Sequence, residues 1–414
     1  MANTNVFETK LSNRMQVTRY STPVYAALAS FEERANMVNG QAVVRPTFGR
    51  LYADSYTRGS DLTAQNYTET SETLTINTTK ALLLPVDNFD IIQHKSNIQQ
   101  RLADDGMKAL NKQIDADFLA EVANATSVVD ASLFGGSSGS PISLDQSNVV
   151  SIYGAALRAL QAQDIDITGG VDPRPQAGNM KPGGQGGAAV LSPWFYEQFV
   201  LSQSGRETSD GDMVGKNGYM SKYFGFDNYV STNGYWTGTL TIATQPTDGD
   251  TVTVNGVVFT FKTTLGSTAG NVLIGASADS ANTNLTALIN TPGTTTSEGV
   301  ALSAANIRLL NRITATANTT PNTMTLVAKG FGHVVTSETL TAAADIWSLE
   351  TSHQLFGQKG AIDMVVQDKV SVQVSDIPAQ LGKYIKPNVL YGLKTFTEGA
   401  QALVDVKIDS STWA

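Results

Sequence analysis

The chain has 414 residues, which is long enough for two or three domains and a sizeable hydrophobic core. Charged residues make up only 16% of it, the net charge is −9, and no cluster of Lys and Arg stands out, so a grip on nucleic acid through its phosphates is disfavoured. It contains no Cys, which excludes a disulfide framework, thiolate metal sites and Cys nucleophiles.

The amino-terminal 21 residues are polar, and the sequence predicts an extended arm there. They lack a basic start followed by an apolar core, so we expect no secretory signal, and no apolar run reaches the roughly 18 residues that a membrane span needs. We therefore expect a soluble protein made in a cytoplasm. Thr22 and Pro23 then predict a short helix to about Asn36, with Thr as the cap and Pro at the first helical position.

A long polar hairpin is predicted next. Residues 43–52 and 72–80 both have the pattern of strands, and the Gly, Ser and Asp within 56–63 favour a turn between them. Neither arm carries a broad apolar face, and a two-stranded hairpin alone is marginally stable in water. The hairpin is therefore expected to lie against another molecule, and a second copy of the same chain is the simplest candidate.

One long amphipathic helix follows a short apolar strand predicted at 82–87. It is expected to run from Ser96 to about Asn124, because Ser96 and Gln99 have the spacing of a capping box. Its apolar residues recur at multiples of four and form one stripe along roughly seven turns: Ile98, Leu102, Leu110, Ile114, Phe118 and Val122. Such a helix can support a sheet.

The next part of the chain alternates between helices and strands. After a loop predicted at 126–141, Ser143 and Gln146 have the spacing of a second capping box and predict a helix. A long Gly- and Pro-rich loop at 169–187 leads into a buried strand at 188–191, and Ser192 with Pro193 predicts a further helix. This alternation, continued to residue 235, indicates one compact α/β unit.

Near Trp236 the composition changes, and residues 237 to about 345 are rich in Thr, Ala, Asn and Gly. Asn255-Gly256, between two alternating apolar runs, predicts a hairpin with a type I′ turn. Further elements of this block are predicted as two helices, around 282–290 and 304–312, and a strand pair, 312–317 and 323–328. The block is expected to be a self-contained small domain, inserted in a host whose pattern resumes near Gln354 and ends in β-rich segments at 363–374 and 389–408.

No catalytic, cofactor-binding or metal-binding residue is predicted. The three histidines, His94, His333 and His353, are too scattered in the sequence to suggest a metal cluster. The Gly-rich stretch 183–187 lacks the Gly-Lys-Ser/Thr ending of a phosphate-binding loop and is interpreted as a flexible loop. No Gly-x-Ser-x-Gly elbow is present, so nothing predicts an enzyme.

The acidic residues of the chain are likewise not interpreted as catalytic or metal-binding groups. Four of them are expected to form a solvated face of the long helix: Asp104, Asp105, Asp115 and Asp117. Three others lack the alternating spacing of a calcium loop: Asp61, Asp87 and Asp90.

The order of these elements resembles that of a tailed-bacteriophage major capsid protein, which has the Hong Kong 97 phage-type shell fold. The phrases that carry the resemblance are 85–90 before the long helix, 113–119 near its end and 389–400 in the last β segment. The resemblance covers roughly residues 1–235 and 350–414. It implies an α+β Hong Kong 97-type capsid fold with an N-arm, an extended β-hairpin loop, a peripheral domain with a long spine helix and an axial domain, plus a small inserted α/β domain.

The resemblance also implies a division of the chain. The implied parts are an N-terminal arm and short helix (1–42), the extended loop (43–82), a peripheral domain (83–142 and 376–414), an axial domain (143–236 and 346–375) and an inserted surface domain (237–345). The hairpin would then reach over a neighbouring subunit, and the Gly/Pro loop at 169–187 would be a candidate for the centre of the hexamers and pentamers.

The function implied is that of a major capsid protein that assembles through hexamers and pentamers into an icosahedral shell around a double-stranded DNA genome. Its expected partners are other copies of itself, a scaffolding protein, a portal and a decoration protein, with no membrane, no cofactor and no sequence-specific binding of DNA. A separate scaffolding protein, or prior cleavage, is expected because no long scaffolding segment precedes the arm. The protein is expected in the virion, after assembly in the host cytoplasm, and no cross-link through Lys80 is predicted.

Alternatives remain open at this point. An encapsulin-type compartment shares the fold and would enclose protein cargo without DNA. A tail or decoration protein would account for the inserted block but not for the long helix and polar hairpin. A secreted carbohydrate-binding protein fits the Thr and Asn content, and a hydrolase is the least favoured class.

Overall fold

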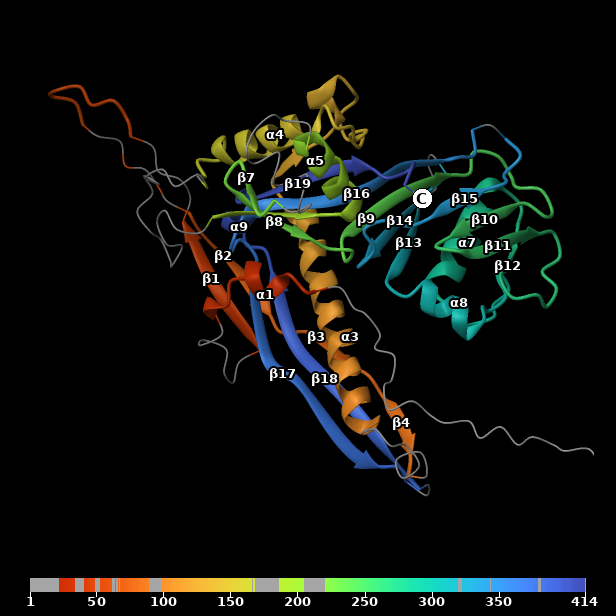
Figure 1. Ribbon diagram of the computed structural model, residues 1–414. Coiled ribbons are helices and arrows are strands. Elements are labelled where there is room, and N and C mark those ends of the chain that lie inside the picture. Colours follow the sequence, from red (N-terminus) through yellow and green to blue (C-terminus); the bar gives the residue numbers. More distant parts are fainter. Residues whose placement is uncertain are drawn as a thin grey trace, which may run out of the picture.

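The computed structural model describes residues 22–33, 41–48, 53–61, 64, 66, 68–88, 98–165, 167, 186–204, 220–318, 322–342, 344–378 and 381–413. The chain is a mixed α+β protein with four recognisable parts (Figure 1). A body built on a nine-stranded sheet carries two helices on top, and a long helix with two long strands runs down from it. A thin hairpin lies on one side of the body and a lobe of small strands and helices on the other.

The amino-terminal helix is shorter than predicted. Helix α1 (Tyr25–Leu28) is a single turn that begins after Val24. Residues 29–33 do not continue it as an α-helix, and the rest of the predicted helix, 34–36, lies outside the described residues. The predicted cap at Thr22 is therefore wrong. Its place is taken by a tertiary contact, because the N–H groups of Val24 and Tyr25 donate to the carboxylate of Asp115.

The polar hairpin is confirmed, but its second arm is shorter than predicted, and residues 49–52 of its predicted first arm lie outside the described residues. Strand β1 (Ala42–Phe48) pairs antiparallel with β2 (Glu69–Thr75) through seven residues on each side. The prediction of one strand over 72–80 is wrong, because the chain leaves the hairpin at Ile76. That side chain is buried against the body, and β3 (Thr78–Ala81) pairs with a strand of another sheet.

The long helix lies on a second, four-stranded sheet. Helix α3 (Ile98–Ala120) ends in a 3-10 turn, η2 (Glu121–Asn124), and the predicted start at Ser96 lies outside the described residues. The sheet consists of β17 (Asp363–Asp376), β18 (Gly382–Lys394), β3 and β4 (Leu84–Asp87), with β18 in the middle. Two residues of the predicted stripe, Leu110 and Ile114, pack on Tyr391 and other apolar side chains of this sheet.

The nine-stranded sheet of the body is organised around one long strand, β16 (Trp347–Gln358). One edge of β16 pairs with β19 (Leu403–Asp409), and β19 pairs in parallel with β5 (Ser127–Val129). The other edge pairs first with β9 (Tyr235–Thr241) and then with β6 (Gly187–Leu191). The remaining strands on that side are β8 (Phe226–Val230), β7 (Lys222–Tyr223), β14 (Thr323–Lys329) and β13 (Ile313–Asn318).

Three sequence predictions for the body need correction. The loop predicted at 126–141 contains β5 and the 3-10 helix η3 (Ala131–Phe134). Helix α4 (Val149–Gln161) begins six residues after Ser143, because Asn148 bonds back to the Ser143 carbonyl at 2.8 Å and holds a turn there. The segment predicted as β at 389–408 is broken by helix α9 (Thr397–Gln401).

The strand and helix predicted around residue 190 are confirmed. Strand β6 is buried along its whole length, as its apolar sequence requires. Helix α5 (Pro193–Ser204) follows with Pro at its first position, and the hydroxyl oxygen of Ser192 accepts the N–H of Phe195 at 3.3 Å.

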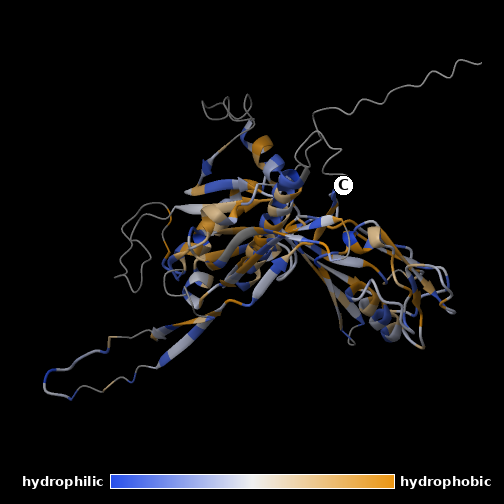
Figure 2. Cartoon of the chain, turned by 90° about the horizontal axis from the view of Figure 1, so that it is seen from below, coloured by the Kyte–Doolittle hydropathy of each residue, from blue (hydrophilic) through white to orange (hydrophobic). Residues whose placement is uncertain are grey.

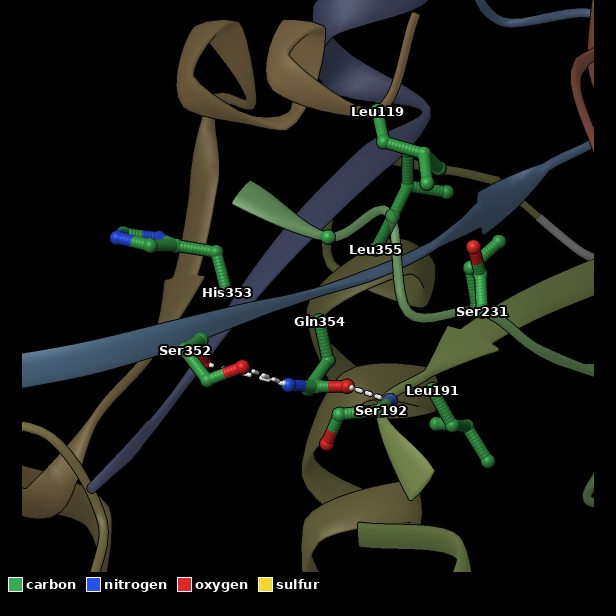
Figure 3. Close-up of a pocket in the computed structure, with 10 residues that line it drawn as sticks. Leu119, Leu191, Ser192, Ser231, Ser352, His353, Gln354 and Leu355 are labelled. Atoms are coloured by element: carbon green, nitrogen blue, oxygen red, sulfur yellow. Dashed lines mark hydrogen bonds between the residues drawn. The ribbon is translucent and has the colours of Figure 1, made fainter. Parts of the chain in front are cut away.

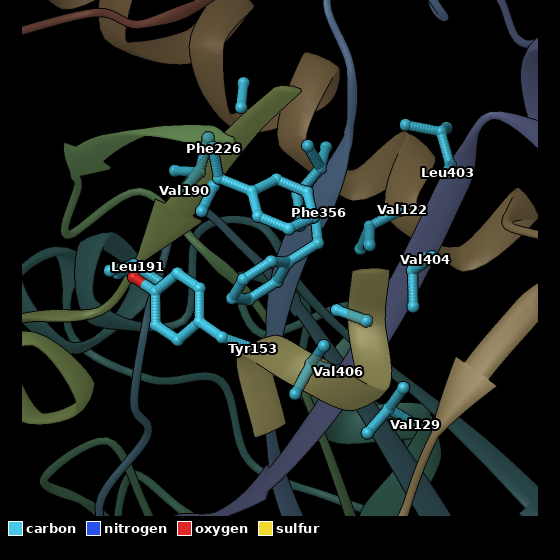
Figure 4. Packing of buried hydrophobic residues seen from close by; sticks show 14 of the residues in the cluster. Val122, Val129, Tyr153, Val190, Leu191, Phe226, Phe356, Leu403, Val404 and Val406 are labelled. Atoms are coloured by element: carbon cyan, nitrogen blue, oxygen red, sulfur yellow. The ribbon is translucent and has the colours of Figure 1, made fainter. Parts of the chain in front are cut away.

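Aromatic side chains fill the core between the sheet and helices α4 and α5 (Figure 4). Tyr153 of α4 is fully buried, and its ring lies 5.1 Å from that of Phe356 and 6.2 Å from that of Phe226. Its hydroxyl donates to Asn228 Oδ1 at 2.8 Å, which satisfies the one polar atom it brings into the core. Burial raises the pKa of Tyr153 well above its ordinary value, so it stays a neutral donor.

The inserted lobe begins with the predicted hairpin. Strands β10 (Thr251–Val254) and β11 (Val257–Lys262) are joined by Asn255 and Gly256, whose φ angles of 49° and 79° are those of a type I′ turn. These strands form a four-stranded sheet with β12 (Asn271–Leu273) and β15 (Thr336–Glu338). The two predicted helices are α7 (Ala278–Asn290) and α8 (Ala304–Leu309), so the elements of this block are confirmed.

The lobe has its own apolar core, but two of its strands are part of the sheet of the body. Its core extends from Trp236 to Val334 and is distinct from the core under α4 and α5. However, β13 and β14 belong to the lobe by sequence and to the body by pairing, because β14 pairs with β9 and β9 pairs with β16. The expectation of a self-contained domain is therefore wrong in this respect. The division of the chain into numbered domains stays a prediction.

Candidate functional site

The hairpin β1–β2 is the most exposed built element of the described chain, and it projects away from the body as a thin arm (Figure 2). Most of its residues are exposed or half-buried, and two of its apolar residues are largely exposed: Val44 is 58% exposed and Phe48 is 62% exposed. Tyr56, at the tip, is 60% exposed. Uncovered apolar side chains on an arm without a core are typical of a surface that another protein covers.

The base of this hairpin is firmly held. Leu74 and Ile76 are buried against Val365 and Phe396. Beside them, the Arg45 guanidinium donates to Glu33 at 2.7 Å and to Asp363 at 3.2 Å, and it lies 4.1 Å from the centre of the Phe396 ring. The arrangement combines charge-assisted hydrogen bonds with a cation–π contact.

At the base of the hairpin the charged form of Arg45 is favoured, whereas burial disfavours the charged form of Asp363. Burial raises the pKa of Asp363, and Arg45 opposes that shift. Burial lowers the pKa of Arg45, but the bonds to its two carboxylates outweigh burial and raise it. Arg45 therefore stays charged and ties the hairpin to strand β17, which carries Asp363.

The long helix is tied to the amino-terminal segment and to the body by a buried carboxylate. Asp115 is fully buried and accepts hydrogen bonds from the N–H groups of Val24 at 2.7 Å and Tyr25 at 3.0 Å, and from Asn233 Nδ2 at 2.8 Å. Burial raises the pKa of this carboxyl, and the hydrogen bonds oppose the shift. The prediction that Asp115 belongs to a solvated face is wrong, because the body packs over that side of α3.

Asp117 also faces the protein and not bulk water. It accepts the hydroxyl of Tyr391 at 2.5 Å and lies 3.6 Å from Lys80 Nζ. Asp104 and Asp105 do lie on the exposed side of α3, bonded to Gln100 and Lys108, as predicted for a solvated face. Helix α3 thus has two acidic residues on its exposed side and two that face the rest of the protein. The spacing of its apolar residues did not distinguish these two pairs.

The arrangement nearest to a catalytic one is a hydroxyl, an imidazole and a carboxylate in a row. Thr237 Oγ1 lies 2.9 Å from His353 Nε2, and His353 Nδ1 lies 2.9 Å from both carboxylate oxygens of Asp405. The three residues come from β9, β16 and β19 and form a diagonal across one face of the sheet. The side chains of His353 and Asp405 are only 7% and 6% exposed.

No room for a substrate accompanies this row. The pocket next to it holds a space of about 10 Å³, which is enough for roughly one water molecule. Figure 3 shows His353 and Gln354 on opposite sides of β16, and Gln354 fills its side by bonding to Ser192 N at 2.5 Å and to Ser352 Oγ at 2.9 Å. We interpret the row as a buried polar ladder that joins three strands.

The other residues considered for chemistry are not brought together. Within the described residues, no group of three His, Asp or Glu side chains could hold a metal ion. His333 lies against Trp194 and Trp413, whereas His353 bonds to Thr237 and Asp405. His94 and Asp90 lie outside the described residues. The Gly-rich stretch is described only from Gly186, where it enters β6. No helix among the described residues is long and apolar enough to cross a membrane.

Comparisons with known proteins agree with this picture at the level of the fold. No protein-family model and no curated protein matches the sequence. Among solved structures, a chain from Mycobacterium phage Che8 is similar over 98% of both chains, with 12% identity and a TM-score of 0.57. A chain from Mycobacterium phage Ogopogo is similar over 97% of both, with 11% identity and a TM-score of 0.50.

A chain described as the capsid structure of the Cyanophage P-SCSP1u is also similar, over 98% of this chain and 93% of that one, with 9% identity and a TM-score of 0.49. Identities this low show a shared fold and nothing finer. The α+β fold that the sequence led us to expect is therefore confirmed, and chains of two mycobacteriophages share it over nearly the full length.

Proposed function

We propose that this protein is the major capsid protein of a tailed double-stranded DNA bacteriophage and that it assembles through hexamers and pentamers into an icosahedral shell. The observation that carries the proposal is the full-length similarity to a chain of Mycobacterium phage Che8, which leaves no large part of either chain unmatched. The protein would act as a structural component of the virion and not as an enzyme.

The exposed hairpin supports this proposal because it is rigid at its base and uncovered along its arms. In an assembly of identical copies, β1–β2 of one subunit would lie over its neighbour and bury Val44, Phe48 and the residues of the tip. Contacts of this kind are heterologous, and they generate closed rings when the rotation between subunits closes. Apolar area buried in each contact adds about 25 cal/mol per Å², so many small contacts stabilise a large particle.

The other parts of the chain have proposed places in the shell as well. The helix α3 with its four-stranded sheet would form the peripheral domain, and the region of α4, α5 and β6 the axial domain around the centre of each capsomer. Residues 237–345 would form a surface domain, and a decoration protein is a candidate partner for it. A scaffolding protein and a portal would take part in assembly, and the DNA would be enclosed without sequence-specific binding, as the net charge of −9 favours.

Co-expression with candidate scaffolding proteins from the same genome tests the proposal. The lysate is sedimented and the fast fraction is examined by negative-stain electron microscopy. Closed shells, or separate hexamers and pentamers, are the expected result. Shells that form without a scaffolding protein and enclose another protein as cargo would favour an encapsulin-type compartment, and a monomer under all conditions would refute the capsid proposal.

A further inference from the structure

The inserted lobe is joined to the body through an irregular point in strand β16. The pairing of β16 with β9 shifts register between Ser348 and Thr351, and Leu349 has a φ of 51°. A branched side chain in this left-handed region is strained by about 1–2 kcal/mol. The bulge turns Leu349 outward, where it is 48% exposed, and turns Glu350 inward, where it is only 8% exposed.

Glu350 bonds to the lobe on one side and to the body on the other. The hydroxyl of Thr336, the first residue of β15, donates to Glu350 Oε1. The backbone carbonyl of Glu350 accepts the N–H of Ser410 at 2.9 Å and the Ser410 hydroxyl at 3.1 Å, just beyond the end of β19. The side chain of Glu350, a residue of β16 in the body, thus contacts the last strand of the lobe, while its backbone carbonyl bonds to the residue that follows β19.

The charges around Glu350 oppose its ionisation. Asp409 is paired with Thr351, the residue next to Glu350, and burial followed by the field of Asp409 raises the pKa of Glu350 from 4.5 to about 7. The other elements packed here contribute neutral groups, namely Thr336 from β15, Trp236 from β9 and Ser410 after β19. Among the described residues, no Lys or Arg forms an ion pair with Glu350.

We propose that Glu350 is a catch between the inserted lobe and the body, that is, a side chain whose protonation state controls how firmly the lobe is attached. When it is neutral, the side chain stays beneath β15 and holds that strand through Thr336. When it is ionised, its oxygen is a stronger acceptor for the Thr336 hydroxyl, but burial and the nearby Asp409 outweigh this gain. They drive the carboxylate toward water, and the bond to Thr336 is lost. The lobe is then less firmly attached above neutral pH than below it. This inference follows from the joint itself and does not depend on the proposed function.

The protein contains its own reporter for this joint. All four tryptophans of the chain lie around it. Trp236 donates to Ser410 Oγ at 2.9 Å, and Trp347 donates to the carbonyl of Ser337 in β15 at 3.3 Å. Trp194 and Trp413 stack on one another with their centroids 5.0 Å apart, and His333 lies against both rings. Movement of β15 or of the end of β19 therefore changes the environment of these indoles.

The test is a titration of the full chain from pH 5 to pH 9, followed by tryptophan fluorescence. A reversible transition with a midpoint near pH 7 is expected. In Glu350→Gln, which keeps an oxygen to accept the Thr336 hydroxyl, the transition is lost and the signal stays at its low-pH value. In Asp409→Asn the midpoint moves down toward 4.5, the ordinary value for Glu.

Two controls separate this catch from other titrating groups. Glu338→Gln changes another Glu of β15, and His333→Gln removes the imidazole that lies against two tryptophans; both are expected to keep the transition. Hydrogen exchange of peptides spanning 334–342, corrected for intrinsic rates, gives a second readout and should show reduced protection above pH 7 in the wild type only. A transition that persists in Glu350→Gln, or that disappears in His333→Gln, overturns the proposal.

Discussion

Replacing Asp115 by Ala tests whether one buried carboxylate holds the amino-terminal segment to the long helix. The substitution leaves the N–H groups of Val24 and Tyr25 and the amide of Asn233 without their acceptor. An unpaired buried donor costs about 1–3 kcal/mol, so the two backbone groups alone cost about 2–6 kcal/mol. Burial of the Asp115 carboxylate is itself unfavourable, as its raised pKa indicates, so its removal offsets part of this cost. We therefore expect a net loss of about 3 kcal/mol.

The loss should be local before it is global, because α1 is a single turn and Asp115 accepts the N–H groups at its start. Hydrogen exchange of a peptide covering residues 22–30 measures it directly. A loss of about 3 kcal/mol corresponds to exchange that is faster by roughly two orders of magnitude, at 1.4 kcal/mol per factor of ten. Asp115→Asn should lie between the wild type and Ala, since its oxygen can still accept the two backbone N–H groups.

Asp105→Ala is the matched control on the same helix. Its carboxylate is 36% exposed and bonds only to Lys108 at 3.4 Å, so the expected change is below about 0.5 kcal/mol. If exchange of 22–30 is the same in Asp115→Ala as in Asp105→Ala, the role assigned to the buried carboxylate is wrong.

Three further predictions concern the hairpin, the core and the joint. Arg45→Ala should loosen the base of the hairpin by about 1–3 kcal/mol, seen as faster proteolysis within β1–β2, while Arg45→Lys keeps the charge and loses less. Tyr153→Phe leaves the buried Oδ1 of Asn228 without its hydrogen-bond donor and should lower thermal stability by about 1–2 kcal/mol without changing the fold. An unchanged melting temperature would contradict the assigned bond. For Glu350, whose folded-state pKa of about 7 lies above 4.5, the folded protein binds more protons between these values, so its stability falls as pH rises from 4.5 to 7. Glu350→Gln removes this pH dependence. The variant should be no more stable than the wild type at pH 4.5 and more stable by about 1–2 kcal/mol above pH 7, allowing for solvent screening. Chemical denaturation measured across that pH range gives both values.

The sequence by itself determined the elements that carry strong local signals. The Asn255-Gly256 turn is an example, because the φ angles of a type I′ turn are available to few other residue pairs. The start of α5 is another, since Ser192 and Pro193 satisfy the helix terminus with local groups. The apolar stripe of α3 also predicted correctly that one face of this helix supports a sheet.

Tertiary structure decided the features that depend on partners distant in the sequence. Ser143 failed as a cap because Asn148 holds a competing turn, and the predicted strand over 72–80 was divided because Ile76 is drawn into a cluster with Val365 and Phe396. Asp115 reads as a surface residue, and only the packing of residues 24, 25 and 233 around it makes it a buried acceptor.

The candidate site shows the same division. Polar, alternating strands without an apolar face predicted an exposed hairpin, because periodicity along a strand is a local property. The Arg45 cluster and the catch at Glu350 could not be predicted in this way, since they join residues up to 318 positions apart. Hydrogen bonds and pKa shifts at such points arise from burial and from the charges that the fold brings together, and neither quantity exists until the chain has folded.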